Sequence, residues 1–127
     1  QERVEHLRPL LADALDDLPI VASWQRVRRH RRPPRSLRLG RTYVGERRIT
    51  VHPVLARTGV PPHVVDMVVF HELCHLASPP LSREQAARQR EHRIHHRAFR
   101  QLEARYPHLE EARRWVDRHL EELLKRA

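Results

Sequence analysis

The chain has 127 residues, which suits a single domain with a modest hydrophobic core, and we expect one domain over residues 1–127. Hydrophobic residues make up 39% of the sequence and aromatic residues only 5%, so the core should consist mainly of Leu, Val and Ala. No apolar run approaches the roughly 18 residues that a membrane-spanning helix needs, which argues against a membrane protein. The single cysteine, Cys74, excludes an internal disulfide. Together with the missing signal-peptide segment at the start, it favours a cytoplasmic location.

The net charge of +9 comes from one stretch of the chain. From Trp24 to Arg48 this stretch holds ten arginines and one acidic residue, Glu46, whereas basic and acidic residues balance elsewhere. Such a composition is typical of a solvated basic surface, or of a surface for nucleic acid or acidic partners. Few aromatic residues stand among the arginines, so base stacking has little support. The segment Arg26–Arg48 is therefore a candidate nucleic-acid surface.

The first part of the chain predicts a helix followed by a small sheet. Leucines recur at helical spacing, and Pro9 fits the first turn, so we expect a helix from about Arg8 to before Pro19. From there the apolar pattern becomes that of strands, with extended runs at about 21–27, 37–43 and 49–51. Turns are expected at Pro33-Pro34 and at Gly45-Glu46. Residues 20–53 thus predict a basic, three-stranded, mostly antiparallel sheet with its arginines on the exposed face.

An apolar helix is predicted between Pro61-Pro62 and Pro79-Pro80. Residues 71–75 within it read His-Glu-Leu-Cys-His, an HExxH pattern. His71 and His75 lie one turn apart on one face and can bind one metal ion, with Glu72 in reach of a water on that ion. Because the helix is apolar on most sides, these polar groups need partners, which a metal supplies. Cys74 points away from this face and is predicted to be a small buried residue.

Two further helices are expected after the motif. Ser82 and Gln85 form a capping box that begins a helix, which Pro107 ends. The last helix spans 108–126 and carries its apolar residues on one side. The sequence therefore predicts an α+β fold in which residues 61–106 form the metal-binding helices and residues 108–126 a C-terminal helix.

A catalytic zinc keeps three protein ligands, so a third ligand must come from elsewhere in the chain. His95 shares the predicted buried face of its helix with Phe99 and Leu102, while His96 points about 100° away. His95 is therefore favoured, and His96 is the alternative. Metzincin spacing is excluded, because the residues at 78 and 81 are Ser and Leu rather than Gly and His.

Other residues near this point leave further alternatives open. A glutamate ligand is one of them, with Glu91 favoured over Glu84. His92 could pair with His96 in a separate surface site, or it could stand beside the metal on the substrate side.

Residues 65–76, Val-Asp-Met-Val-Val-Phe-His-Glu-Leu-Cys-His-Leu, resemble the motif helix of the SprT-like and YgjP-like metallopeptidases. Residues 49–55, Ile-Thr-Val-His-Pro-Val-Leu, are similar to the strand and Asn-Pro-x-Leu turn before that helix. His95 and Phe99 match the family's His-x-x-x-aromatic pattern, although nineteen residues between His75 and His95 are more than is usual. The resemblance covers about residues 8–106. It implies a minimal zincin fold without a zinc ribbon, with His71, His75 and His95 as Zn²⁺ ligands and Glu72 as the general base.

The predicted function is therefore a zinc-dependent peptidase that cleaves peptide bonds with metal-activated water. A peptide or protein substrate would pair with the sheet edge, expected at Arg47–Val51. Tyr106, His92 or an arginine would stabilise the oxyanion. The alternatives are a basic zinc module that binds DNA or RNA, including a peptidase for protein bound to nucleic acid, and a zinc-binding protein without activity.

Overall fold

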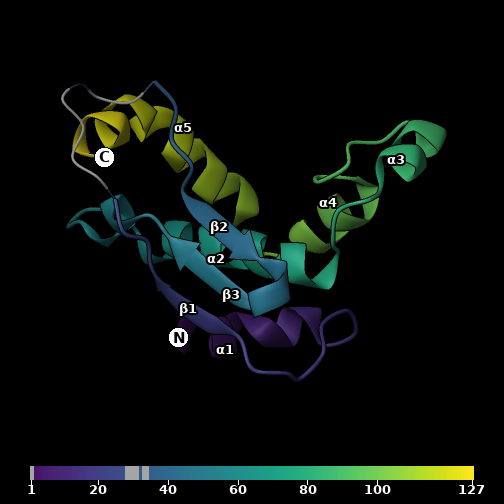
Figure 1. Cartoon of the computed structure of the whole chain (residues 1–127). Coiled ribbons are helices and arrows are strands. Elements are labelled where there is room, and N and C mark those ends of the chain that lie inside the picture. The colour runs from purple at the N-terminus through teal and green to yellow at the C-terminus, as the bar shows by residue number, and fades with distance from the viewer. Residues whose placement is uncertain (1, 28–31, 33–34) are drawn as a thin grey trace.

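The computed structural model describes residues 2–27, 32 and 35–127 (Figure 1). In this part of the chain five α-helices and one three-stranded sheet form an α+β fold. The predicted turn at Pro33-Pro34 lies outside the described residues, as do the arginines at 28, 29 and 31. No helix among the described residues is long and apolar enough to cross a bilayer.

The N-terminal helix lies earlier in the chain than the sequence predicted. Helix α1 spans Glu2–Leu7, and a short 3₁₀ helix over Arg8–Leu11 follows it, with Pro9 in its first turn. The chain turns beyond it instead of continuing the helix, and an aspartate that binds the nearby backbone favours this turn. Asp16 accepts a hydrogen bond from the backbone N–H of Leu18 at 3.0 Å.

The sheet consists of β1 (Val21–Trp24), β2 (Gly40–Tyr43) and β3 (Arg48–Val51) in the order β1-β3-β2. β1 runs parallel to β3 and β2 antiparallel to it, so the sheet is mixed, with one pairing of each kind. A tight turn, the 3₁₀ segment Val44–Glu46, joins β2 to β3 and makes them neighbours. β2 comes next in the chain after β1 but lies at the other edge of the sheet, and β3 lies between them.

The central position of β3 overturns one prediction. Arg47–Val51 was expected to form the edge at which a substrate strand could be added. β3 is instead hydrogen-bonded on both sides, so neither of its edges is open. The strands with an open edge are β1 and β2, and β2 is the one that contacts helix α2.

Helix α2 (Pro62–Ala77) is the centre of the core, as its prolines and apolar composition predicted. It packs against β2, β3, α1, α4 and α5. Alternation along the strands turns Gly40, Thr42 and Ile49 toward this helix and leaves Arg41 and Arg48 on the opposite face of the sheet. Figure 1 shows α2 behind the sheet, and none of the described helices lies over the other face. The arginines described for these strands thus lie on the uncovered face, as predicted.

The helix predicted from Ser82 to Pro107 is two helices, α3 (Arg83–Gln89) and α4 (Arg97–Glu103). The capping box of Ser82 and Gln85 is present, but Arg90 adopts a left-handed conformation with φ of 56° and ends α3. The irregular segment that follows places His95 in a loop just before α4. The last helix, α5 (Leu109–Arg126), agrees with the prediction.

Candidate metal centre

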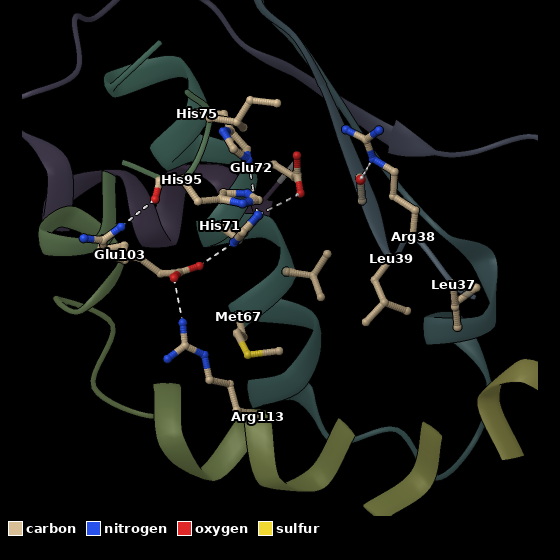
Figure 2. A pocket seen from close by; sticks show the side chains of 14 residues that line it. Leu37, Arg38, Leu39, Met67, His71, Glu72, His75, His95, Glu103 and Arg113 are labelled. Carbon is tan, nitrogen blue, oxygen red and sulfur yellow. Dashed lines mark hydrogen bonds and ion pairs between the residues drawn. The ribbon is translucent and has the colours of Figure 1, made fainter. Parts of the chain in front are cut away.

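Three histidines converge at one end of a cleft between α2, α4 and the sheet (Figure 2). His71 and His75 come from α2 and His95 from the loop before α4, and one ligand nitrogen from each lies within 4.8 Å of the others. The two Nε2 atoms of His71 and His75 are 3.2 Å apart. The three residues that the sequence singled out as ligands are thus brought together, and this cluster could hold a metal ion.

The ring of Phe99 packs against all three imidazoles. Its ring centroid lies 5.0 Å from that of His71, 4.4 Å from that of His75 and 5.0 Å from that of His95. Phe99 is buried in the core, so the histidines pack against a fixed apolar side chain. This contact explains why an aromatic residue stands four positions after His95.

His96, the alternative third ligand, points away from the cluster and has a structural role. Its Nδ1 accepts a hydrogen bond from the backbone N–H of Phe99 at 3.4 Å and so caps α4. Its Nε2 then carries the proton and donates to the carbonyl oxygen of Pro79 at 3.1 Å. Both ring nitrogens are in use, which rules out His96 as a ligand here and rules out its pairing with His92.

The two glutamates that were alternatives to a third histidine also lie elsewhere. Glu84 is exposed and pairs with Arg88 at 2.9 Å. Glu91 accepts hydrogen bonds from the backbone N–H of Arg97 at 3.1 Å and from Arg100 at 3.2 Å. Neither belongs to the histidine cluster.

Glu103 on α4 is a site residue that sequence reasoning missed. Its Oε2 accepts a hydrogen bond from Nδ1 of His71, and its Oε1 pairs with Arg113 at 2.7 Å. Burial works to raise the pKa of Glu103, but the hydrogen bond and charge of His71, helped by Arg113, bring it below the ordinary value. With the proton of His71 held on Nδ1, the lone pair of Nε2 faces the cluster. The sequence could have revealed Glu103, because it shares a face of the predicted helix with Phe99 and Tyr106, where an apolar residue is expected.

Glu72 lies beside the histidines and is almost fully buried. Its Oε1 accepts a hydrogen bond from the Thr42 hydroxyl at 2.6 Å, and its Oε2 lies 4.0 Å from Nε2 of His71. Burial raises the pKa of Glu72, and the Thr42 hydrogen bond partly opposes that rise. One carboxylate oxygen is therefore anchored to β2 while the other faces the histidine cluster.

Two of the three histidines, His75 and His95, have a lowered pKa. Burial, and then the charges of His71 and His95, lower the pKa of His75 to about 4. Burial and the charge of His71 also lower the pKa of His95. Near neutral pH both rings are uncharged, which is the form that binds a metal.

Gly40 on β2 is a second residue that the sequence did not point to. A Cβ placed there would lie 2.9 Å from both Cγ and Oε2 of Glu72 and 3.0 Å from Cγ1 of Val68. Only glycine lets β2 approach α2 this closely while Glu72 keeps its place.

We expect Gly40→Ala to displace the Glu72 carboxylate and leave the histidines in position. A shift of about 1 Å in a reacting group costs about 100-fold in rate, so any peptide hydrolysis that uses Glu72 should fall by that order while metal affinity stays unchanged. Peptidase assays beside a metal titration check this. Gly45→Ala is the matched control, because nothing lies within 4 Å of a Cβ at Gly45. Equal activity of the two variants would contradict the role given to Gly40.

The cleft that the three histidines border has a volume of about 670 Å³. The described residues that line it, besides the cluster and Glu72, are Leu37, Arg38, Leu39, Gly40, Met67, Val68, Ile94, Arg100, Glu103 and Arg113. A cleft of this size with a mixed polar and apolar lining is typical of a ligand-binding site. Of the predicted oxyanion donors, only arginines border it.

Tyr106, His92 and Cys74 all lie away from the cleft. The Tyr106 hydroxyl donates to the carbonyl oxygen of His63 at 2.7 Å, and its ring stacks on Phe70. His92 borders a separate hollow beside α3. Cys74 is fully buried, as predicted, and burial raises the pKa of its thiol.

Comparison of the chain with protein-family models, with curated proteins and with solved structures finds no match.

Proposed function

We propose that this chain is a zinc-dependent peptidase of the kind that its resemblance to SprT-like proteins implies. The observation that carries the proposal is the convergence of three imidazoles beside a buried carboxylate that is held by Thr42 and faces them. Three imidazoles with no thiolate or further carboxylate among them suit Zn²⁺ with one position left for water. The contact between Glu103 and His71 supports the same assignment, because metal-binding histidines commonly donate their second nitrogen to a carboxylate.

His71, His75 and His95 would hold the ion in this proposal. Zinc would supply Lewis-acid catalysis, lowering the pKa of a water and polarising the substrate carbonyl. Glu72 would accept a proton on Oε2 and return it to the leaving amine, while Thr42 holds Oε1 in place. Because burial raises the pKa of Glu72, this carboxylate is a stronger base than an exposed one.

The substrate strand would lie along β2 rather than along Arg47–Val51. The carbonyl of Leu39 accepts a hydrogen bond from His52 on the side of β3. The next carbonyl, that of Gly40, points to the opposite side, because backbone groups alternate along a strand. It accepts a hydrogen bond from Nε of Arg38 at 3.2 Å, so a substrate N–H would use its second lone pair. Gly40 borders the cleft, so an extended peptide paired with this edge would lie across the histidines.

A mixture of peptides of varied sequence tests the proposal. The protein is freed of metal with a chelator, divided, and reloaded with zinc in one half, and cleavage is followed by mass spectrometry. We expect cleavage only in the zinc-loaded half. A protein fully loaded with zinc that cleaves no peptide would contradict the proposal and favour a zinc-binding protein without activity.

Glu103→Gln should weaken metal binding without removing a ligand. The loss of a carboxylate that orients a ligating histidine typically costs about 10–100-fold in metal affinity. Competition with a chelating dye measures this affinity directly. Glu110→Gln is the matched control, because exposed Glu110 pairs with the same Arg113, at 3.5 Å, but has no contact with His71. If both variants bind zinc like the unmodified protein, Glu103 does not position His71.

A second candidate function is binding of nucleic acid, favoured by the uncovered face of the sheet. Arg26, Arg41 and Arg48 border a hollow of about 490 Å³ there, together with Trp24 and Tyr43. The guanidinium of Arg48 lies 3.9 Å from the centre of the Tyr43 ring. Binding to single-stranded and duplex oligonucleotides, measured against salt concentration, tests this candidate. It predicts affinity that falls steeply with salt, and no binding near about 50 mM salt would exclude it.

A further inference from the structure

Three arginines border the cleft, and two of them are neutralised by nearby carboxylates. Arg100 pairs with Glu91 at 3.2 Å and also donates to the carbonyl oxygen of His95 at 2.8 Å. Arg113 pairs with Glu103 at 2.7 Å and with Glu110. Both guanidinium groups are therefore charge-paired within the site.

Arg38 differs from the other two. Its Nε donates to the carbonyl oxygen of Gly40 at 3.2 Å, and within the described part of the chain its two terminal nitrogens contact no acceptor. No ion pair joins it to a described carboxylate; the two carboxylates that line the cleft, Glu72 and Glu103, lie beside His71 and Arg113 instead. The hydrogen bond from Nε fixes the plane of the guanidinium and leaves two parallel N–H groups free. Figure 2 shows this group on the wall of the cleft across from the histidines, on the side of Glu72.

The wall beside Arg38 is apolar. Leu37 and Leu39 flank it in the sequence and border the cleft with Met67. Figure 2 shows Leu37 and Leu39 near each other on the strand side and Met67 facing them from α2, with the guanidinium turned away from the two leucines. Leu37, Leu39 and Met67 are each only partly buried, so a substrate side chain placed against them would remove apolar surface from water.

We propose that the cleft selects peptides that present a carboxylate to Arg38 beside an apolar side chain packed on Leu37, Leu39 and Met67. A guanidinium donates two parallel hydrogen bonds to a carboxylate, and the orientation already set by Gly40 reduces the entropy lost on binding. The carboxylate can belong to an acidic side chain or to a free C-terminus, since both have the same chemistry. This inference rests on the proposed peptidase function and deepens it.

Matched peptides test the inference through binding. One pair differs only as Glu against Gln beside a leucine, and another differs only as a free C-terminus against its amide. Affinity is measured by fluorescence anisotropy on zinc-loaded Glu72→Gln protein, so that nothing is cleaved. We expect one carboxylate peptide to bind about tenfold more tightly than its neutral partner, as for a charge-assisted hydrogen bond. The pair with the larger ratio identifies the source of the carboxylate.

Variants of Arg38 in the same background decide whether this residue causes the preference. Arg38→Gln should remove the preference, and Arg38→Lys should keep part of it because the charge remains. Arg38→Glu should reverse it in favour of a peptide with lysine at the same position. Arg118→Gln is the control, because Arg118 is exposed on α5 and does not border the cleft. Equal affinities within both pairs, or a preference that survives Arg38→Gln, would overturn the inference.

Cleavage assays separate this inference from the proposed function. With Glu72 intact, the unmodified protein should cleave the carboxylate peptide with a higher kcat/KM than its neutral partner, and Arg38→Gln should bring that ratio to about one, whatever its effect on the rate for the neutral peptide. If zinc-loaded protein cleaves no peptide at all, the peptidase function fails, and the anisotropy series still decides whether Arg38 binds a carboxylate.

Discussion

Replacing His95 by alanine lowers the affinity for zinc by more than about 100-fold, which exceeds the cost of losing a supporting contact. The reason is the position of its ring, 5.1 Å from that of His71 and 5.0 Å from that of His75. No described Asp, Glu, Cys or further His completes the group in its place. Competition with a chelating dye measures the loss.

His96→Ala is the matched control for this result, because it changes the neighbouring histidine. It removes the cap of α4 and should lower the free energy of unfolding by about 1 kcal/mol, while zinc affinity stays unchanged. Urea unfolding of the zinc-free proteins measures the first effect without interference from the metal. Loss of zinc binding in His96→Ala with retention in His95→Ala would contradict this assignment and make His96 the ligand.

Replacing Glu72 by glutamine should reduce peptide hydrolysis by about 10³-fold or more, within the range that a general base contributes. The amide has nearly the same shape as the carboxylate and can still accept the hydrogen bond from Thr42, so the fold and the metal affinity should stay as they are. It cannot accept a proton, and this is the one function removed. Initial rates of the two zinc-loaded proteins, compared at equal metal content, measure the effect.

Glu72→Asp serves as a second variant, because it keeps a proton acceptor but withdraws it by one methylene. Its rate should lie between those of the unmodified protein and Glu72→Gln. If Glu72→Gln binds zinc and hydrolyses peptides at the unmodified rate, another group is the base and the mechanism is wrong.

The motif helix could be predicted almost to the residue because the features that define it are local. The prolines on either side fix where the helix begins and ends, and the helical period alone places His71 and His75 on one face. His95 was chosen over His96 by extending a helix through both, yet α4 begins only at Arg97. The choice agrees with the observed cluster, but the reason differs: His96 turns inward to cap α4, and His95 remains beside α2.

The parts that sequence reasoning missed depend on contacts between distant segments. Gly40 and Thr42 meet Glu72 only because β2 lies against α2, and nothing in the pattern of strands says which of them is central. Glu103 reaches His71 across the packing of α4 on α2. Helix ends were misplaced where polar side chains bind the nearby backbone, as Asp16 and His96 do.

The central claim is that His71, His75 and His95 together hold one zinc ion beside Glu72. X-ray absorption at the zinc edge, on protein loaded with one equivalent and washed free of excess metal, tests it most directly. The claim predicts one zinc per chain, bound by three imidazoles and one further oxygen or nitrogen, with no sulfur ligand. A zinc content far below one per chain, fewer than three imidazoles, or a sulfur ligand from Cys74 would contradict it.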